Sequence, residues 1–323
     1  MSKIIYIDLF CGAGGFSEGF HLTGKYEPVL AIDNFRPAAQ TFKANFPSVT
    51  VLLEDIKEVT KHTLEEILGD LSGIDMVIGS PPCEPFTGAN PRREKNPIDR
   101  LYRDPIGQLT LHYIRLVGII KPKIFIMENV PAIMDNGLEQ ALRTEFRRIG
   151  YKKIYFNVLK AEDYGSPSHR VRVFVSNIRI KPKKISKRIR VIDVLGDLPE
   201  PGKGFPPNHE PPPPLPVKKL KRITRLKWGN ALIYYEGARR RLPNLIRLDP
   251  YKPAPTVLGS SRFIHPFENR FLTVREQARL MGFPDTFVFF GGRDEQYNMI
   301  GEAVPVPLAK AIAEYVLEVF EEV

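Results

Sequence analysis

The order of short apolar runs and amphipathic stretches in the first half of the chain constrains its fold more than any other feature. Several apolar runs are hydrophobic at consecutive positions, as in strands that helices cover on both faces. Strands that alternate with helices in this way predict an α/β fold with an open, mostly parallel sheet. The predicted strands are 3–10, 28–33, 49–55, 74–80, 123–130, 153–159 and 171–177, and the predicted helices are 36–46, 63–71, 107–120 and 138–149.

The alternation stops near residue 179, which predicts a second part of different construction. Segment 206–216, "PPNHEPPPPLP", cannot form a helix or a central strand, because proline lacks the backbone N–H that both require. The amphipathic stretch 304–320 predicts a helix that returns to cover one face of the sheet. We therefore expect a domain of residues 1–178, completed by 297–323, and a smaller domain of residues 179–296.

Positive charge is concentrated in the predicted smaller domain. The 323-residue chain has a net charge of +10, and residues 179–250 contain 18 Lys+Arg against 6 Asp+Glu. A basic segment beside a nearly neutral body indicates contact with nucleic acid, although a solvated basic surface would have the same composition. The candidate contacts are Lys218, Lys219, Lys221, Arg222, Arg225, Arg239, Arg240 and Arg241.

Other features argue against several classes of protein. No apolar run reaches the ~18 residues of a membrane span, and the N-terminus reads as a strand rather than a signal peptide. The two cysteines, Cys11 and Cys83, give neither a disulfide framework nor the spacing of metal ligands. These features predict a soluble, cytoplasmic protein without a metal, and the absence of a heptad pattern favours a monomer.

A glycine-rich turn follows the first predicted strand. In "DLFCGAGGFSEG", Gly12 and Gly14 are followed by Ser17, where a dinucleotide-binding fingerprint would have glycine. The turn therefore suits a nucleoside better than a pyrophosphate, although such turns often only pack a strand on a helix. Asp33, 21 residues after Gly12, is placed to accept hydrogen bonds from ribose hydroxyls, and Asp55 could accept one from an exocyclic amine. Either carboxylate could instead cap a helix.

Reactive and charged side chains follow the later strands. Cys83 lies between prolines in "GSPPCEPFT", a rigid loop that suits a nucleophile. Glu128 ends a strand in "MENV", where apolar neighbours would desolvate it and suit it to sharing a proton. Arg170 and Arg172 alternate in "SHRVRVF", so both point to one side of a strand and can bind an anion. The plain alternatives are a buried thiol, a carboxylate on a backbone amide and an exposed edge strand.

Together these motifs resemble the cytosine-C5 DNA methyltransferase family. The shared order is the glycine turn, the ribose acid, the third-strand aspartate, the Pro-Cys loop, "ENV" and the paired arginines. "LTVREQARLMGFPDTF" (272–287) and "YNMIGEAVPVPLA" (297–309) are similar to the family's last motifs. The likeness spans the chain except about 179–250, where the family carries its variable target-recognition region. It implies a Rossmann-like methyltransferase sheet, a smaller basic target-recognition domain and duplex DNA as the partner.

The resemblance also implies roles for the matched residues. Cys83 would attack C6 of a flipped-out cytosine, while Glu128 would hydrogen-bond N3 and the exocyclic amine. Arg172 would steady the base, and Arg170 would hold the loop or a phosphate. The pocket for S-adenosylmethionine, and for its product S-adenosylhomocysteine, would comprise Phe10, Gly12, Ala13, Gly14, Asp33, Asn34, Asp55, Ile56, Pro82, Leu109, Glu302 and Ala303. A cognate restriction endonuclease is a partner that such an enzyme could have.

Three positions depart from the family pattern. Ser168 stands where the family has a glutamine that supports the loop around the flipped base, and it is included among the candidate DNA contacts. Glu302 replaces an asparagine of the last motif. Glu84 follows Cys83 where glutamine is common, and its charge is expected to raise the pKa of the thiol.

Two other functions fit the same scaffold. One branch of the family modifies tRNA, and "SPPCEPFT" looks much like its loop, but the Cys-Phe-Thr tripeptide associated with that branch is absent. The other alternative is a nucleic-acid-binding protein without activity, which only the departures at Ser168 and Glu302 favour. Cys83, Glu128 and Arg172 are all present, so an active DNA methyltransferase is the preferred interpretation.

Overall fold

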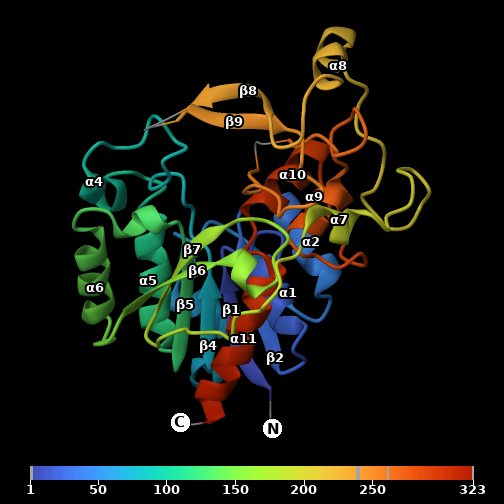
Figure 1. The fold of residues 1–323 in the computed structure, drawn as a ribbon. Coiled ribbons are helices and arrows are strands. Elements are labelled where there is room, and N and C mark those ends of the chain that lie inside the picture. Colours follow the sequence, from blue (N-terminus) through green and yellow to red (C-terminus); the bar gives the residue numbers. More distant parts are fainter. Residues whose placement is uncertain (1–2, 238–240, 260–261, 322–323) are drawn as a thin grey trace.

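A seven-stranded sheet forms the centre of the computed structural model, which describes residues 3–237, 241–259 and 262–321 (Figure 1). The strand order is β3-β2-β1-β4-β5-β7-β6, and β7 runs antiparallel to both of its neighbours. The strands are β1 (Ile4–Leu9), β2 (Tyr26–Asp33), β3 (Thr50–Leu53), β4 (Met76–Gly79), β5 (Ile124–Asn129), β6 (Tyr155–Lys160) and β7 (Val171–Ser176). The predicted α/β fold with a mostly parallel sheet is confirmed, and each of the seven predicted strands is present.

Alternating side chains along each strand pack on helices at both faces of the sheet. In β1, Ile7 belongs to the core on one face and Tyr6 to the core on the other, and both are fully buried. The first face is covered by α3 (Lys61–Leu68), α5 (Leu109–Ile120) and α6 (Leu138–Arg148). The other is covered by α1 (Gly15–His21) and α11 (Val306–Glu321), so the predicted return of the C-terminal helix is confirmed.

A third core joins the edge of the sheet to later parts of the chain. Phe42, on α2 (Arg36–Asn45), is buried in one cluster with residues of α7 (Val191–Leu195), α9 (Val274–Leu280) and α10 (Arg293–Glu302). Helices α7 and α9 lie inside the range assigned to the smaller domain, yet they pack against the large one. Residues 179–296 therefore share part of their core with the large domain, and their division into a smaller domain remains a prediction.

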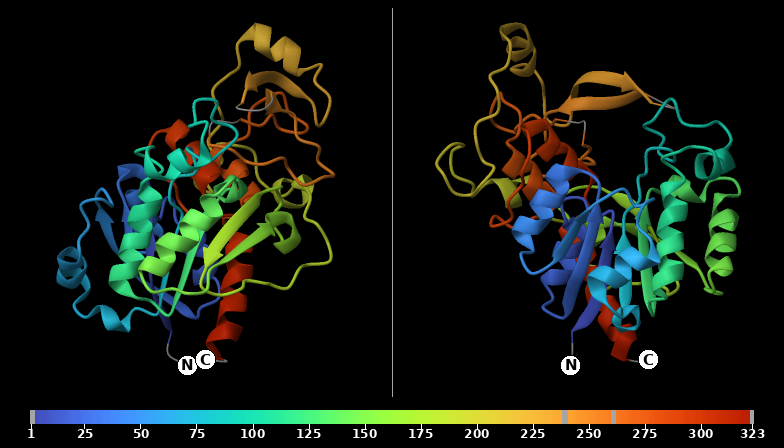
Figure 2. Two further views of the ribbon diagram at one scale, coloured as in Figure 1. Left: turned by 90° about the vertical axis from the view of Figure 1, so that its left-hand side faces the viewer. Right: turned by 180° about the vertical axis from the view of Figure 1, so that it is seen from behind.

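The outer part of the smaller domain is a short helix and a two-stranded hairpin. These are α8 (Val217–Ile223), β8 (Ala231–Glu236) and β9 (Arg241–Ile246), and Ile223, Leu245 and Ile264 form their own small core. The views in Figures 1 and 2 agree that the hairpin extends from this domain towards the side of the large domain that carries α4 (Pro97–Tyr102). It lies beyond the carboxyl ends of the parallel strands. This hairpin was not predicted from the sequence.

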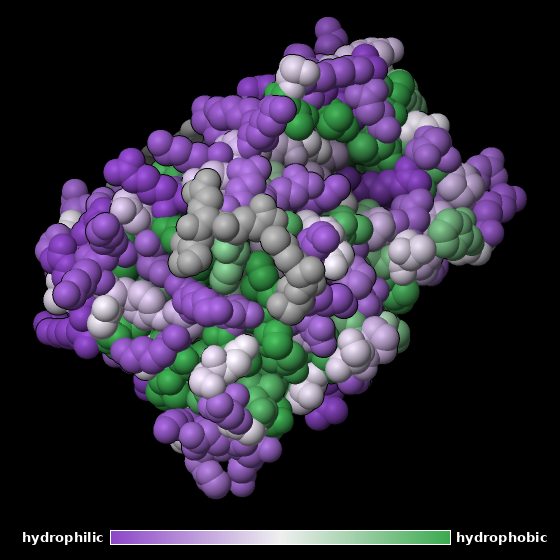
Figure 3. Space-filling model, turned by 90° about the horizontal axis from the view of Figure 1, so that it is seen from below, coloured by the Kyte–Doolittle hydropathy of each residue, from purple (hydrophilic) through white to green (hydrophobic). Residues whose placement is uncertain are grey.

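The end of the molecule that carries both termini lies opposite the smaller domain (Figures 1 and 2). Seen from below in Figure 3, this end carries hydrophilic side chains over most of its outline, with smaller groups of hydrophobic ones between them. Within the described part of the chain, no helix has the length and hydropathy needed to cross a membrane.

Candidate active site

The carboxyl ends of neighbouring parallel strands bring the candidate residues together. Leu9 in β1 pairs with Gly79 in β4, and Gly79 pairs with Met127 in β5, so these strands end at about the same level. The glycine turn follows β1, Asp33 ends β2, the Pro-Cys loop follows β4, and Glu128 lies next to the end of β5. In open α/β sheets, ligands bind at this edge.

The glycine turn and Asp33 form one hydrogen-bonded unit. The backbone N–H of Gly12 donates to Oδ2 of Asp33 at 2.8 Å, and that of Phe35 donates to Oδ1 at 2.9 Å. Burial raises the pKa of Asp33, and these backbone donors oppose that effect. A Cβ added at Gly12 would meet nothing within 4 Å, whereas one at Gly15 would lie 2.6 Å from the carbonyl oxygen of Val304. The backbone is thus open to a ligand at Gly12 and closed by packing at Gly15.

The remaining cofactor candidates surround this turn. Phe10 has a φ of 57°, a left-handed conformation that bulky residues rarely adopt, and it turns the chain at the end of β1. Ala13 and Ile56 are buried, Asn34 is exposed, and Phe10, Asp55, Pro82 and Leu109 are half-buried. The structure therefore places these candidates along one edge of the sheet, with different degrees of access to a ligand.

Arg115 fixes the turn that follows β3, and it was not predicted from the sequence. Its guanidinium donates to the carbonyl oxygens of Ile56 at 2.9 Å and Val59 at 2.8 Å. These contacts hold the turn that contains Asp55 against α5. No local motif marks Arg115, because its partners lie 59 and 56 residues away in the chain.

Hydrogen bonds to the backbone carbonyl oxygens of Pro81 and Cys83 anchor the Pro-Cys loop. Nδ2 of the fully buried Asn129 donates to the carbonyl oxygen of Pro81 at 3.1 Å. The N–H groups of Phe86 and Thr87 donate to the carbonyl oxygen of Cys83 at 3.0 and 2.9 Å. The thiol side chain itself is only half-buried. Asn129 was not singled out from the sequence, although its place directly after Glu128 at a strand end was a usable signal.

Glu128 and Arg172 form a buried ion pair near Cys83. Nε of Arg172 lies 2.8 Å from Oε1 of Glu128, and the two side chains are 12% and 6% exposed. None of the described residues gives that oxygen a well-aligned hydrogen bond, so it keeps the capacity to accept one from a ligand.

Arg170 is buried on the same side of the site. Its guanidinium donates to the carbonyl oxygens of Val257 at 2.8 Å and Glu302 at 3.3 Å. Its Nε has no hydrogen-bond partner among the described residues. Of the two roles expected for Arg170, this geometry supports holding a loop rather than reaching a phosphate at the surface.

Charges around Cys83 act on its thiol in opposite directions. Burial raises the pKa of Cys83, Arg172 and Arg170 lower it, and Glu128 and Glu302 add to the rise. Burial also disfavours the charged form of Arg170 and lowers its pKa to about 9. Glu84 is exposed, and burial rather than Glu84 is the main cause of the raised thiol pKa, which corrects the expectation from the sequence. The arginines are therefore the groups that favour the reactive thiolate.

Comparison with known proteins assigns the chain to a family. The family model "C-5 cytosine-specific DNA methylase" matches residues 4–318. The chain belongs to this family. Two relatives of this methylase from Methanocaldococcus jannaschii, each named "Putative type II methyltransferase", are 45% and 49% identical to it. The alignments cover 97% and 95% of this chain and 98% and 97% of the relatives. A type II methyltransferase of Desulfomicrobium norvegicum is 33% identical over 98% of this chain and 89% of its own.

Solved structures share the fold of the methylase. An E. coli prophage protein described as "putative DNA modification methyltransferase" has a TM-score of 0.79 at 24% identity and covers 99% of this chain and 100% of its own. The Dnmt2 methyltransferase of S. pombe has a TM-score of 0.66 at 16% identity, with 99% of each chain covered. At these identities the likeness shows the fold alone. The family predicted from the motifs is confirmed, and the methylase is an S-adenosylmethionine-dependent DNA cytosine-C5 methyltransferase.

Ser168 of the methylase has a structural role, which corrects its inclusion among the DNA contacts. Its side chain is fully buried, and its Oγ donates to the carbonyl oxygen of Leu280 at 2.8 Å. The backbone around it also bonds to a distant segment, because the N–H of His169 donates to the carbonyl oxygen of Ala254 at 2.8 Å. Ser168 therefore ties the chain before β7 to α9 and does not reach solvent.

Most of the basic candidates lie on the outer part of the smaller domain. Lys219 is half-buried, with its Nζ 5.7 Å from the ring centroid of Phe271. Arg239 and Arg240 lie outside the described residues. For all of the basic candidates, contact with DNA remains a prediction. The exposed candidates are Lys218, Lys221, Arg222, Arg225 and Arg241.

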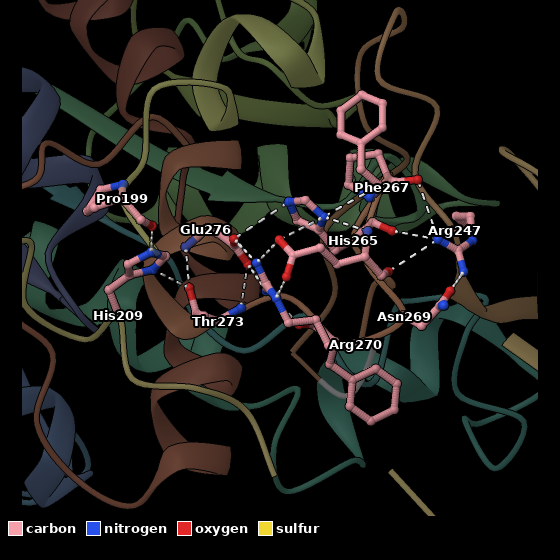
Figure 4. A network of polar contacts seen from close by, with 12 residues as sticks. Pro199, His209, Arg247, His265, Phe267, Asn269, Arg270, Thr273 and Glu276 are labelled. Atoms are coloured by element: carbon pink, nitrogen blue, oxygen red, sulfur yellow. Dashed lines mark hydrogen bonds and ion pairs between the residues drawn. The ribbon is translucent and has the colours of Figure 1, made fainter. Parts of the chain in front are cut away.

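A polar network that the sequence did not reveal joins the outer part of the smaller domain to α9 (Figure 4). Arg247 donates to Oδ1 of Asn269 at 2.6 Å, and Arg270 pairs with Glu276 at 2.8 Å. Glu276 accepts from the backbone N–H of Thr273 at 2.7 Å and so closes the N-terminal cap of α9. The network holds the segment between β9 and α9 in a defined position relative to the catalytic core.

Proposed function

We propose that this type II DNA cytosine-C5 methyltransferase acts on a cytosine flipped out of duplex DNA, with Cys83 as its covalent nucleophile. The observation that carries the proposal is the group of Cys83, Glu128 and Arg172 at one edge of the sheet. It combines a thiol on a rigid loop with a carboxylate and a guanidinium that form a buried ion pair. A cytosine inside the stack cannot be approached from above its ring, so the base must leave the duplex.

Each step of the proposed reaction has a group in this chain to carry it. The Cys83 thiolate adds to C6 while Glu128 shares its proton with N3 and accepts a hydrogen bond from the exocyclic amine, which neutralises the negative charge that develops on the ring. C5 then becomes nucleophilic and takes the methyl group. Loss of the C5 proton to solvent and elimination of the Cys83 thiolate restore the C5–C6 double bond. Arg172 keeps the carboxylate of Glu128 oriented towards the base.

The residues around the glycine turn fit the methyl donor. When bound, S-adenosylmethionine supplies an electrophilic methyl group on a sulfonium ion. The open backbone at Gly12 leaves room for such a ligand, and Asp33 retains lone pairs for ribose hydroxyls besides the two backbone donors that it already accepts. Asp55 and Ile56, in the turn that Arg115 holds, are the groups that would contact the adenine. Asp33 would anchor the ligand while the turn shapes its pocket.

The proposed function is tested by the transfer of labelled methyl from S-adenosylmethionine to duplex DNA and, in parallel, to unmodified tRNA. We expect label in DNA, at one short sequence that mapping of the modified cytosines will identify. A restriction endonuclease that cuts at that same sequence is the expected cellular counterpart. Label in tRNA alone would overturn the DNA assignment, and no transfer to either would favour a binding protein without activity.

The exposed basic residues of α8, and Arg225 just after this helix, are expected to bind the DNA backbone. Replacing Lys218, Lys221, Arg222 and Arg225 by alanine should weaken DNA binding and flatten its salt dependence. Each lost phosphate contact reduces the slope of log K against log salt by about 0.9, so the four changes should reduce it by up to about 3.6. Fluorescence anisotropy at several salt concentrations measures this slope. The matched control replaces Lys61 and Lys310, which form surface ion pairs elsewhere, and an unchanged slope in the α8 variant would contradict the assignment.

A further inference from the structure

A cavity of about 360 Å³ lies where the smaller domain meets the chain that leads into β7. Its volume falls within the range of about 300–1,000 Å³ that is usual for pockets that bind small ligands. Its walls include His169, Arg188, Trp228, Asp249 and Lys252. None of these residues belongs to the catalytic group or to the cofactor turn, so the cavity has no role in the reaction described above.

The cavity and the catalytic site lie on opposite sides of one stretch of chain. Ser168 forms a parallel bridge with Ala254, so the backbone that enters β7 is extended here. Consecutive side chains of an extended chain point to opposite sides. Arg170 reaches the carbonyl oxygen of Val257 on the catalytic side, whereas His169 lines the cavity. A ligand in the cavity would therefore not occupy the place of the flipped base.

An exposed cluster of aromatic rings forms one wall of the cavity. Trp228 is 45% exposed, and its Nε1 donates to the carbonyl oxygen of Pro266 at 2.8 Å, which fixes the orientation of the ring. The rings of Tyr251 and Phe267 lie edge-on to it, with centroids 5.7 and 6.0 Å away, and both side chains are more than half exposed. A fixed aromatic ring that remains open to solvent offers a surface on which a planar ligand can stack.

Positive charge surrounds the mouth of the cavity beside Arg188. The segment "RIKPKKISKRIR" (179–190), which carries Arg188, contains seven Lys+Arg and no Asp or Glu. Nη2 of Arg188 lies 3.6 Å from Oδ1 of Asp163, but Oδ2 of the same carboxylate already accepts from Lys184 at 2.9 Å. One carboxylate thus serves two cations, and the Arg188 side chain is 55% exposed. The segment therefore keeps an excess of positive charge for an anionic ligand.

Lys252 and His169 add polar groups to the other walls. Nζ of Lys252 lies 3.2 Å from Oδ2 of Asp249, and the lysine side chain is largely exposed. Ion pairs this exposed are weak, so a phosphate can compete for the ammonium group. Nδ1 of His169 lies 3.0 Å from Oε1 of Glu162, which orients the imidazole ring while leaving much of it open to solvent.

We propose that this cavity binds an unpaired nucleotide of single-stranded DNA or RNA, with its base stacked on Trp228 and its phosphates on Arg188 and Lys252. Aromatic rings beside a basic track are the means by which proteins hold single strands without reading their sequence. Inside a duplex both faces of a base are covered by its neighbours, so only an unpaired base can offer a face to the ring. Segment 179–190 continues the contact along the strand. The site does not depend on the proposed function.

The fluorescence of Trp228 tests the proposal directly, because this residue is the only tryptophan of the chain. The probes are an oligothymidylate, an RNA oligouridylate and a DNA duplex, each of about 12 nucleotides or base pairs, a length within the usual site sizes for single strands. We expect the single strands to quench the fluorescence at saturation, since stacking brings the base against the indole ring. Quenching by either single strand supports the proposal, and the one that binds more tightly identifies the source of the ligand.

Variants separate stacking from charge. Trp228→Leu should weaken binding of a dye-labelled single strand by about 5- to 160-fold, the range for loss of one stacked base, and Trp228→Phe should weaken it less. Arg188→Ala and Lys252→Ala should each reduce the slope of log K against log salt by about 0.7, the value for one phosphate contact on a single strand. Arg148→Ala is the matched control, because Arg148 forms a similarly exposed pair with Glu145 on α6.

Three results would overturn the proposal. The first is Trp228 fluorescence that does not change when a single strand is bound at saturation. The second is quenching by the duplex to the same extent as by the single strands, which would assign the contact to the backbone of duplex DNA. The third is a Trp228→Leu variant that is folded in thermal unfolding and binds within twofold of the wild type. None of these readouts uses methyl transfer, so they stand whether or not the proposed function is correct.

Discussion

Replacing Cys83 by alanine will abolish methyl transfer while S-adenosylmethionine binding persists. The thiolate forms the bond to C6, and no neighbouring side chain offers a comparable nucleophile, because the only other cysteine is the buried Cys11. Loss of a nucleophile typically costs at least about 10³-fold in kcat. The direct readout is a covalent adduct with duplex DNA that contains 5-fluorocytosine. Fluorine at C5 cannot leave as a proton does, so the wild-type enzyme should stay attached after methylation.

Cys11→Ala is the matched control for this experiment. It removes the other thiol of the chain, so the adduct in that variant must form at Cys83, and peptide mass spectrometry will locate it. Calorimetry with S-adenosylmethionine will show whether each variant retains a folded cofactor site. An equal yield of adduct from wild type and Cys83→Ala would disprove the nucleophile assignment, whatever the activity of either protein.

Glu128→Gln is expected to lower kcat by about 10²- to 10⁴-fold, the range for loss of a positioned acid or of electrostatic stabilisation. Glutamine keeps the shape and an acceptor oxygen but cannot give N3 the proton that neutralises the ring while Cys83 is bound to C6. Single-turnover methyl transfer at saturating DNA and S-adenosylmethionine will measure the change. Formation of the 5-fluorocytosine adduct should slow by a similar factor, because addition to C6 needs the same stabilisation.

The ion pair with Arg172 makes stability a necessary control for Glu128→Gln. Removing one partner of a buried pair leaves the other charge uncompensated, and the cost in unfolding free energy is about 3–5 kcal/mol in the worst cases. Glu139→Gln breaks a more exposed pair, with Arg143 at 2.7 Å on α6, and serves for comparison in thermal unfolding. If Glu128→Gln is folded and transfers methyl within threefold of the wild type, its proposed role in the reaction is wrong.

Much of the large domain could be predicted because its signals are local. The strand around Ile7 and the helix around Leu116 have side-chain patterns that depend only on the period of each element, and both form as predicted. The same holds for the Pro-Cys loop and Asp33, since parallel strands must bring their carboxyl ends to one edge. The hairpin β8–β9 was missed, because its short strands carry exposed Tyr234 and Pro243 and lack a clear alternating pattern.

By itself, the sequence determined the α/β architecture, the family and the identity of the candidate nucleophile, because these depend on residue type and on spacing along the chain. Tertiary structure decided the roles of residues whose partners are distant in sequence. Asn129 bonds to Pro81, Ser168 bonds to Leu280, and Arg170 bonds to Val257. The physical reason is that hydrogen bonding and electrostatic interaction depend on distance in space, and only folding brings these groups together.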